Sequence, residues 1–401
     1  MQKILLLIAS LFCFNSLFAK NEIKSWQGIH ETPLSRLEQQ FAEPPVEFAN
    51  HVIWGWEGKM DKKTICNDLD SIKKKGFRAV IFEAGYKLPF KYLSEEWFKA
   101  IRTGVLEAKK RDMKVWIIDE GKYPSGFAGG KFSQERPDLR MQALVIDDTI
   151  QIKLGEVMTN HKIAPEIISA VAVSTSGAPN RTVEIDNGKI SFNAGLDDWK
   201  ILLIKSDFRT AVTRAVNNPN GGKDATNSLC DYLNPVAVKQ FIDWTHEQYK
   251  KYLGKELGTT VLGFRGDEPD YAHLPWTPSI VQTFKDTKGY DPTPYLASFF
   301  TASPTIQEQR VEADYWDVWS SLFATHFFKL QADWCAANGV AHITHLNKEH
   351  EMPACVKAEG DYFRNLSKVQ IPGVDAIWNQ IWPGTLNDFP KLASSVAHVY
   401  G

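Results

Sequence analysis

Short, continuously apolar runs alternate with stretches of helical spacing along this 401-residue sequence, and this alternation constrains its fold more than any other feature. The runs at residues 51–56, 77–82 and 114–118 have the length and composition of strands buried on both faces of a sheet. Between them, residues 61–76 and 94–108 place apolar side chains at helical intervals. Neighbouring parallel strands need such crossovers, so the sequence predicts a parallel sheet with helical connections.

The alternation stops near residue 140 and resumes near residue 226. From about 143 to 212, short β-type runs are separated by turn signals, without a helical period of useful length. We interpret this stretch as an inserted β-rich module. The alternative, a long decorated loop, is disfavoured because structureless loops of this length are uncommon in compact domains. Strand-like runs then recur at 260–264, 341–344 and 374–378.

Six strand–helix units are fewer than the eight of a closed barrel. The count leaves two alternatives, an open doubly wound sheet or a truncated barrel sequence. No glycine-rich phosphate turn follows the first strand, which disfavours the dinucleotide-binding type of open sheet. We therefore expect an α/β fold of the (β/α)8 TIM-barrel type, incomplete in this chain, with an inserted β-rich module. The expected domains are 1–19 (signal peptide), 20–140 (barrel strands 1–3), 141–225 (inserted module) and 226–401 (barrel strands 4–6, truncated before closure).

The first residues have the organisation of a signal peptide. Lys3 precedes the apolar segment 4–12, and Ala19 ends a cleavage site before Lys20. The apolar segment is shorter than the roughly 20 residues that a membrane-spanning helix needs, and no later segment is apolar enough to span. We expect an exported protein, periplasmic or extracellular. Export permits disulfides among the cysteines that remain, and the sequence leaves their pairing open.

Composition narrows the class of partner. Acidic and basic residues are mixed along the chain, with a net charge of −2 and no basic block, so nucleic acid is not expected. Tryptophan is unusually frequent, at 13 residues. Its flat face suits stacking on sugar rings, although packing in the core accounts for some of these side chains. An oligosaccharide or polysaccharide is the partner that these features favour.

Carboxylates and aromatic residues follow the predicted strands, at the strand ends where (β/α) barrels place their active sites. Most glycosidases use two carboxylates: one protonates the leaving oxygen, and the other activates water or attacks the sugar. Glu268, just after an apolar strand, is the sharpest candidate for the general acid; a capping or salt-bridged acid is its alternative. The residues expected to contact the substrate are Trp54, Trp56, Glu83, Asp119, Glu120, Tyr123, Asp267, His345, Asp375 and Trp378.

No motif identifies a metal or an organic cofactor. His345 and Glu349 lack the H-E-x-x-H spacing of a zinc protease, and no EF-hand loop occurs. Oxygen-rich strand ends favour calcium over zinc, and the metal ligands stay unassigned. The glycine-rich run at 121–130 lacks the Lys-Ser/Thr ending of a phosphate loop, so no organic cofactor is expected.

Several motifs, which occur along the chain in the family's order, resemble those of glycoside hydrolase family 106, the α-L-rhamnosidase-like enzymes. The most specific is Asp-Glu-Gly-Lys-Tyr-Pro-Ser-Gly-Phe-Ala-Gly-Gly at 119–130; the others include Trp-Gly-Trp at 54–56, Gly-Phe-Arg-Gly-Asp-Glu-Pro at 263–269 and Pro-Gly-Val-Asp at 372–375. The resemblance implies a (β/α)8 catalytic barrel, an inverting mechanism and often a calcium ion at the active site. It also implies further barrel and β-sandwich domains after residue 401.

The same resemblance assigns catalytic roles. Glu268 matches the family's general acid after the fourth strand. Glu349 lies in a His-x-x-x-Glu arrangement similar to the family's and is the best base available in this chain, while a further acid belongs on a seventh strand. The expected function is an exported glycoside hydrolase that cleaves terminal sugars, α-L-rhamnosides in particular. The alternative is a non-catalytic, glycan-binding fragment of such an enzyme.

Overall fold

The computed structural model describes residues 33–42, 50–211, 213–215, 223–224, 226–271, 274–302, 304–377, 380–384 and 388–400. The chain divides into two compact units, Met1–Asn50 and His51–Gly401. In the first unit, helix α2 (Leu34–Ala42) buries none of its side chains. The predicted signal peptide, 1–19, lies outside the described residues. None of the described helices combines the length and apolar character that a membrane span requires.

Six parallel strands form the central sheet of the second unit. Their order, β1-β2-β3-β14-β16-β17, follows the chain, and every neighbouring pair is parallel. This confirms a mixed α/β fold. Among the described strands, β1 and β17 each have one neighbour in this sheet, so closure into a (β/α)8 barrel is not confirmed. The bounds are β1 (His51–Trp56), β2 (Ala79–Ala84), β3 (Lys114–Ile118), β14 (Val261–Arg265), β16 (Ala341–Thr344) and β17 (Ile371–Pro372).

The sixth strand differs from its prediction. It covers Ile371–Pro372, whereas residues 374–377 form no strand. The Asp375 N–H donates to a Glu349 carboxylate oxygen at 3.3 Å, and Ile377 is exposed. The apolar composition of this segment therefore misled the prediction, because its side chains do not pack into the sheet.

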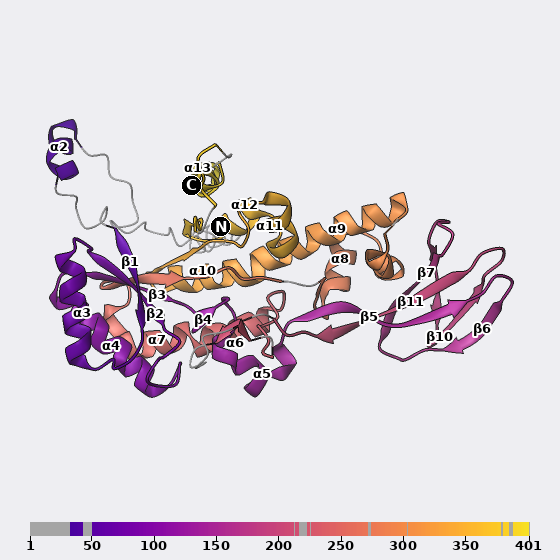
Figure 1. Cartoon of the computed structure of the whole chain (residues 1–401), viewed down its shortest axis with the longest axis horizontal. Coiled ribbons are helices and arrows are strands. Elements are labelled where there is room, and N and C mark those ends of the chain that lie inside the picture. The colour runs from indigo at the N-terminus through magenta and orange to yellow at the C-terminus, as the bar shows by residue number, and fades with distance from the viewer. Residues whose placement is uncertain are drawn as a thin grey trace, which may run out of the picture. The chain divides into compact units, whose positions relative to one another are not determined.

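Helices α3 (Lys62–Lys74), α4 (Glu95–Lys110) and α7 (His246–Leu253) pack beside the first strands, and Figure 1 shows them along one side of β1–β3. The first two begin at N-caps: the Asp61 carboxylate and the Ser94 hydroxyl accept backbone N–H groups three residues further on, at 2.9 and 3.2 Å. Such caps satisfy N–H groups that have no partner within the helix. The strands and helices share one apolar core.

Between β3 and β14 the chain forms mainly antiparallel structure. One sheet has the order β15-β5-β11-β7-β8, and a second has the order β6-β10-β9. Side chains such as Ile152, Ile190 and Trp199 form a small separate core. The bounds are β4 (Lys122–Tyr123), β5 (Gln142–Ile152), β6 (Val157–Lys162), β7 (Ile167–Ser174), β8 (Arg181–Thr182), β9 (Ile185–Asp186), β10 (Lys189–Asn193), β11 (Trp199–Phe208), β12 (Thr213–Ala215), β13 (Lys223–Asp224) and, after β14, β15 (Pro275–Trp276).

A long helical stretch connects β14 to β16. It consists of α9 (Ile306–Leu322), the π-helical turn η6 (Phe323–Phe328) and α10 (Lys329–Ala337). The π turn places the ring of Phe327 4.4 Å from that of Tyr232. The other helices are α5 (Lys131–Glu135), α6 (Pro235–Trp244), α8 (Ile280–Lys288), α11 (Met352–Glu359), α12 (Tyr362–Leu366) and α13 (Pro390–Tyr400), with 3-10 turns η2 (Ala128–Gly130), η3 (Pro137–Leu139), η4 (Gly254–Glu256) and η5 (Thr293–Phe300).

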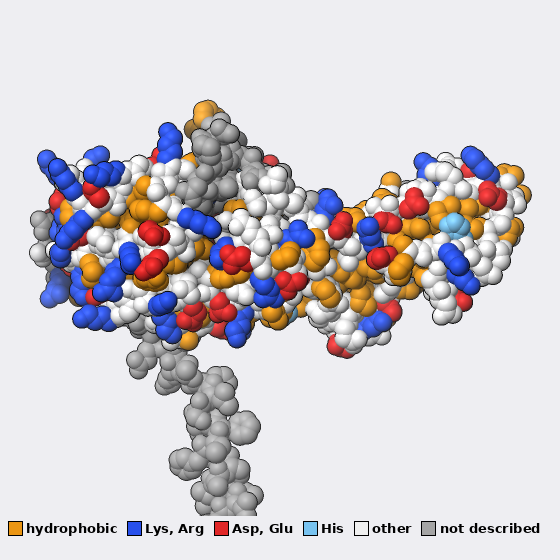
Figure 2. Space-filling model, turned by 90° about the horizontal axis from the view of Figure 1, so that it is seen from below, with side chains coloured by type: hydrophobic (Ala, Val, Ile, Leu, Met, Phe, Trp, Pro, Cys, Tyr) orange, Lys and Arg blue, Asp and Glu red, His pale blue; other side chains and the backbone are white. Residues whose placement is uncertain are grey.

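On the face shown in Figure 2, acidic and basic side chains are interspersed, so this face offers no single-sign field to a charged partner.

The cysteines that the structure describes form no disulfides with one another: Cys66, Cys230, Cys335 and Cys355 are all free thiols. Apolar packing and hydrogen bonds, rather than disulfides between these four, hold the described fold together.

Candidate active site

His345, which follows β16, is surrounded by carboxylates at the carboxyl edge of the parallel sheet. Its Nε2 lies 3.3 Å from Asp267 Oδ1, 3.6 Å from Glu268 Oε1 and 3.8 Å from Asp375 Oδ2. The first two acids follow β14, and the third follows β17. Nε2 is buried and forms no aligned hydrogen bond within the part of the chain that the structure describes. The structure thus brings four of the predicted site residues together.

Opposing effects set the protonation of His345. Burial disfavours the charged ring, but the close approach of Asp267 and Glu268 outweighs it and raises the pKa of His345 to about 9. Arg265 Nη2 lies 3.4 Å from Nδ1, and this contact by itself favours a neutral ring that carries its proton on Nε2. The carboxylates have the larger effect on the pKa, because three of them face Nε2 whereas one guanidinium reaches Nδ1, at a long distance. The ring is then a cation at neutral pH.

The stabilising contribution of His345 is expected to decline between about pH 6.5 and pH 9. Since its folded-state pKa of about 9 lies above the ordinary value of 6.5, the contribution is fully present below the lower value and is lost as the pH rises through the higher one. The free energy of unfolding should differ between wild type and His345→Gln by on the order of 2 kcal/mol at pH 6. Urea denaturation at pH 6, 8 and 10 should show this difference shrinking; a difference that is constant with pH would contradict a charged ring.

Glu268 has a backbone conformation that few residues other than glycine adopt. Its φ is +36°. Strained backbone of this kind costs about 1–3 kcal/mol and is concentrated at functional sites. The preceding residue is anchored, because the Asp267 N–H donates to the Ser125 hydroxyl at 2.7 Å. The side chain of Glu268 is 20% exposed, so its carboxylate is accessible to a ligand.

Glu349, the predicted base, lies behind this cluster and is almost completely buried. Its Oε1 accepts the N–H groups of Leu346 at 2.9 Å and Asp375 at 3.3 Å. Burial raises the pKa of Glu349 to about 7, opposed by the charge of His345. This carboxylate therefore holds the His345 loop and the Asp375 segment in place, and its pKa suits a group that accepts a proton near neutral pH.

The loop after β3 contains Asp119, which is completely buried. The Ser125 hydroxyl donates to its Oδ1 at 2.7 Å, and Oδ2 has no partner among the described residues. Burial raises the pKa of Asp119 well above its usual range. The Ser125 hydroxyl also accepts the Asp267 backbone N–H. Asp119 therefore helps to position Asp267 through Ser125 and does not contact solvent.

The carboxylate of Glu120 lies inside the same loop and binds its backbone. Its Oε1 accepts the N–H groups of Gly121 at 2.6 Å and Gly129 at 2.9 Å, and its Oε2 accepts that of Ala128. Burial raises its pKa to about 7 against these bonds. All of these partners are backbone groups, so the position of Glu120 supports a structural role and not the predicted contact with substrate.

Tyr123, in the same loop, reaches across to the loop after β16. Its hydroxyl accepts from Asn347 Nδ2 at 3.4 Å, and burial raises its pKa. Glu83, at the end of β2, pairs with Lys122 at 3.0 Å. Both predicted residues therefore lie on the sheet edge that carries the cluster, and each already has a protein partner.

The predicted aromatic platform does not form at the first strand. Trp56 is completely buried and Trp54 nearly so, and their rings lie 5.0 and 5.5 Å from that of Phe82. Residues 54 and 56 point to the same side of β1, which is the side that α3 and α4 cover. Neither ring can stack on a sugar in this position. Trp378 lies outside the described residues.

Two ionisable residues of the site were not predicted. Glu359, at the end of α11, is completely buried; its Oε1 accepts the Asn347 N–H at 2.5 Å, and its Oε2 has no partner within the described chain. Burial raises the pKa of Glu359 well above its usual range. Arg265, the last residue of β14, lies beside His345. Glu359 ends a helix, so its sequence position gives no indication that it lies near the site. Arg265 ends a strand and could have been predicted from that position.

A calcium ion does not fit the group that the structure gathers. Glu268, His345 and Asp375 offer three ligand atoms within 4.8 Å of one another. Calcium takes oxygen ligands, whereas one of the three here is an imidazole nitrogen. We therefore derive no step through calcium.

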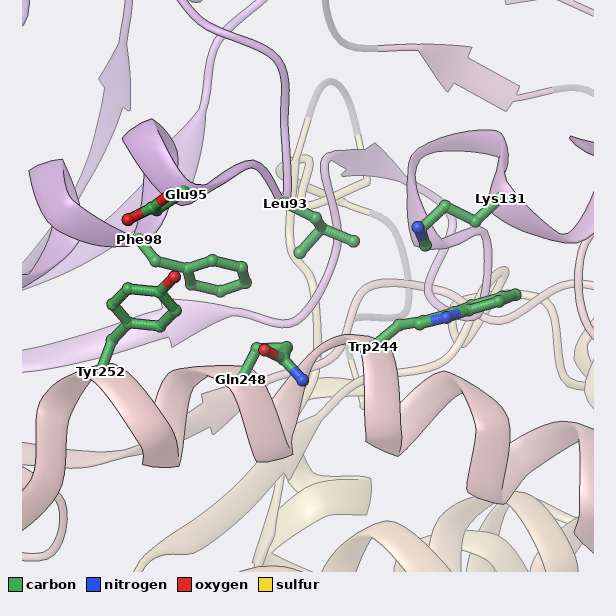
Figure 3. A pocket seen from close by; sticks show the side chains of 7 residues that line it. All are labelled: Leu93, Glu95, Phe98, Lys131, Trp244, Gln248 and Tyr252. Carbon is green, nitrogen blue, oxygen red and sulfur yellow. The ribbon is translucent and has the colours of Figure 1, made fainter. Parts of the chain in front are cut away.

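A pocket away from this cluster is shown in Figure 3. Phe98 of α4 and Tyr252 of α7 stack there with ring centroids 5.0 Å apart, and Lys131 Nζ lies 5.0 Å from the Trp244 ring centre. The pocket is formed by helices and the loop before α4 rather than by strand ends. The carboxylate cluster around His345 therefore remains the candidate active site.

The fold and the site together define an α/β protein with an acid-rich site at the ends of parallel strands. The family model described as alpha-L-rhamnosidase, glycoside hydrolase family 106, matches residues 160–401, which is more than half of the chain. The chain therefore belongs to this family, and the resemblance predicted from its motifs is confirmed.

Two individual proteins are similar over most of the chain. A Formosa agariphila protein, named as a candidate beta-glucuronidase, is 24% identical over 423 aligned residues, which cover 92% of this chain and 34% of that protein. The solved structure of a rhamnosidase from Novosphingobium sp. PP1Y matches with a TM-score of 0.65 and 15% identity, covering 92% of this chain and 52% of that one. The chain thus spans about a third and about half of their lengths, and the structural match supports the shared fold.

Proposed function

We propose that this chain forms the acid-bearing part of an exported glycoside hydrolase that cleaves terminal α-L-rhamnosides. The observation that carries the proposal is the meeting of Asp267, Glu268 and Asp375 at His345, in a chain of the α-L-rhamnosidase family. Carboxylates at strand ends are the groups that glycosidic cleavage requires. Export rests on the signal-like N-terminus alone.

In the proposed mechanism, Glu268 is the general acid. Its side chain is 20% exposed, and its proton passes to the glycosidic oxygen as the bond to the anomeric carbon breaks. His345 stays protonated beside Asp267 and Asp375, so that the negative charge left on Glu268 is balanced. Tyr123 and Asn347 lie next to this cluster as groups that can bind sugar hydroxyls.

The spacing of the carboxylates argues against Asp375 as the base of an inverting reaction. Ligand oxygens of Glu268 and Asp375 lie within 4.8 Å of each other. An inverting pair is about 6.5–9.5 Å apart, because a water molecule must fit between the base and the sugar. Asp375 is too close to Glu268 for that role. Glu349 stays the proposed base, as the family resemblance implies: with a pKa of about 7, it would take a proton from the water that bonds to the anomeric carbon.

Hydrolysis of aryl glycosides tests the function. The 401-residue chain should release nitrophenol from the aryl α-L-rhamnoside and not from the matched aryl β-D-glucuronide, which represents the sugar in the name of the Formosa protein. Turnover of the glucuronide alone would reject the rhamnoside assignment. Binding of rhamnosides by calorimetry without any turnover would reject the enzyme in favour of the glycan-binding alternative.

A further inference from the structure

A second cluster of possible ligands lies in the core, separate from the carboxylates. His246 at the start of α7, Cys335 in α10 and His342 in β16 each offer a ligand atom, and the three atoms lie within 4.8 Å of one another. All three side chains are almost completely buried. Elements that are distant in the sequence therefore place two imidazoles and one thiol around a common point.

The hydrogen bonds of His246 define which nitrogen is available. The Thr245 hydroxyl donates its single proton to the Phe241 carbonyl at 2.7 Å. The same oxygen lies 2.9 Å from His246 Nδ1 and must therefore accept a proton from it. In this tautomer Nε2 carries a lone pair. Histidines that bind metals are oriented in this way, by an oxygen that accepts from the other ring nitrogen.

Two ring nitrogens of the cluster have no hydrogen-bond partner among the described residues. They are His246 Nε2 and His342 Nδ1. Around His246 the neighbours are aromatic: the ring centres of Phe264 and Trp334 lie 4.2 and 5.1 Å away. Buried polar atoms in native proteins almost always have a partner. Here the neighbouring aromatic rings offer no hydrogen-bond partner to His246 Nε2.

We propose that His246, Cys335 and His342 bind one transition-metal ion, with zinc as the expected ion. Thiolate and imidazole are the ligands that zinc prefers in proteins. Zinc–nitrogen and zinc–sulfur bonds of about 2.0–2.3 Å place tetrahedral ligands roughly 3.5 Å apart, which the observed spacing reaches with small side-chain movements. The ion would tie α7 and α10 to β16 from inside the core.

Metal binding requires the ligands in their deprotonated forms. Burial already holds both imidazoles neutral, since it lowers the pKa of His246 and lowers that of His342 to about 4. Burial raises the pKa of the Cys335 thiol, so the incoming ion must displace the thiol proton, which leaves to solvent. Because the site is closed, the ion would enter before folding is complete.

The metal content of the purified 401-residue chain tests this inference. Protein produced in medium with added zinc should retain about one equivalent after dialysis against a chelator, and should release it to a chromophoric chelator on unfolding. Loss of all metal on dialysis, or none released on unfolding, would overturn the proposal; in that case a buried water partners the two nitrogens.

A matched pair of variants locates the ion. Cys335→Ala should lower the metal content at least tenfold, whereas Cys355→Ala, at another fully buried thiol, should leave it unchanged. If Cys335→Ala does not fold, cobalt loading of the wild-type chain during refolding decides the question. A thiolate-to-cobalt absorption band in the near ultraviolet supports the site, and its absence contradicts it.

Discussion

Replacing Glu120 with alanine should destabilise the fold by about 3–5 kcal/mol. The substitution removes the common acceptor of three N–H groups in the loop after β3, and each buried donor that loses its partner costs about 1–3 kcal/mol. The loop also carries Ser125, which holds Asp267 beside the site. Urea unfolding followed by circular dichroism measures the change.

A matched control separates this effect from the loss of a charge. Glu135 pairs with Lys131 across one helical turn, and its side chain is 46% exposed. Glu135→Ala should therefore change the free energy of unfolding by less than about 0.5 kcal/mol. If Glu120→Ala were as mild as Glu135→Ala, the loop would not depend on the buried carboxylate.

Glu268→Gln should reduce kcat/KM for alkyl α-L-rhamnosides by about 10²–10⁴-fold. Glutamine keeps the size of the side chain but cannot donate an acidic proton, and general acid catalysis contributes about this factor. The fold should survive, because Glu268 is partly exposed and its strained backbone is unchanged. Steady-state kinetics with Glu135→Gln as the control measure the loss. A loss of kcat/KM below tenfold would show that another residue is the general acid.

The parallel sheet was predictable, because buried strands and their crossovers have different apolar periods. The pattern at residues 51–118 contains the first three strands and their connecting helices. The sixth strand was misplaced because an apolar run does not show whether its side chains pack, and Ile377 is exposed. The described strands lie in the sheet in their order along the chain, and they do not confirm the predicted closure into a barrel.

The candidate site was predictable as a region and less so residue by residue. The strand ends of β14, β16 and β17 do meet at His345, as parallel strands require. Trp56 and Glu120 were assigned to the substrate because the sequence does not show which face of a strand is covered, or that a carboxylate is satisfied by backbone N–H groups. Glu359 was missed because a helix brings it to the cluster.

The two clusters of the second unit have opposite chemistry. The one at the strand ends is acidic, partly exposed and balanced by a protonated histidine. The one in the core has neutral imidazoles and a thiol and is closed to solvent. His342 and His345 lie only three residues apart, on β16 and in the loop after it, so one short segment contributes to both. A change in the core cluster would therefore be expected to disturb the position of His345.

A comparison of leaving groups tests most directly whether Glu268 protonates the leaving oxygen of a rhamnoside. Wild type and Glu268→Gln would be assayed on two α-L-rhamnosides that share the sugar and differ in the aglycone, one an activated dinitrophenol and one an alkyl alcohol. The loss of kcat/KM should be at least 100-fold greater for the alkyl aglycone, because only that leaving group needs the proton. Equal losses on both substrates would contradict it.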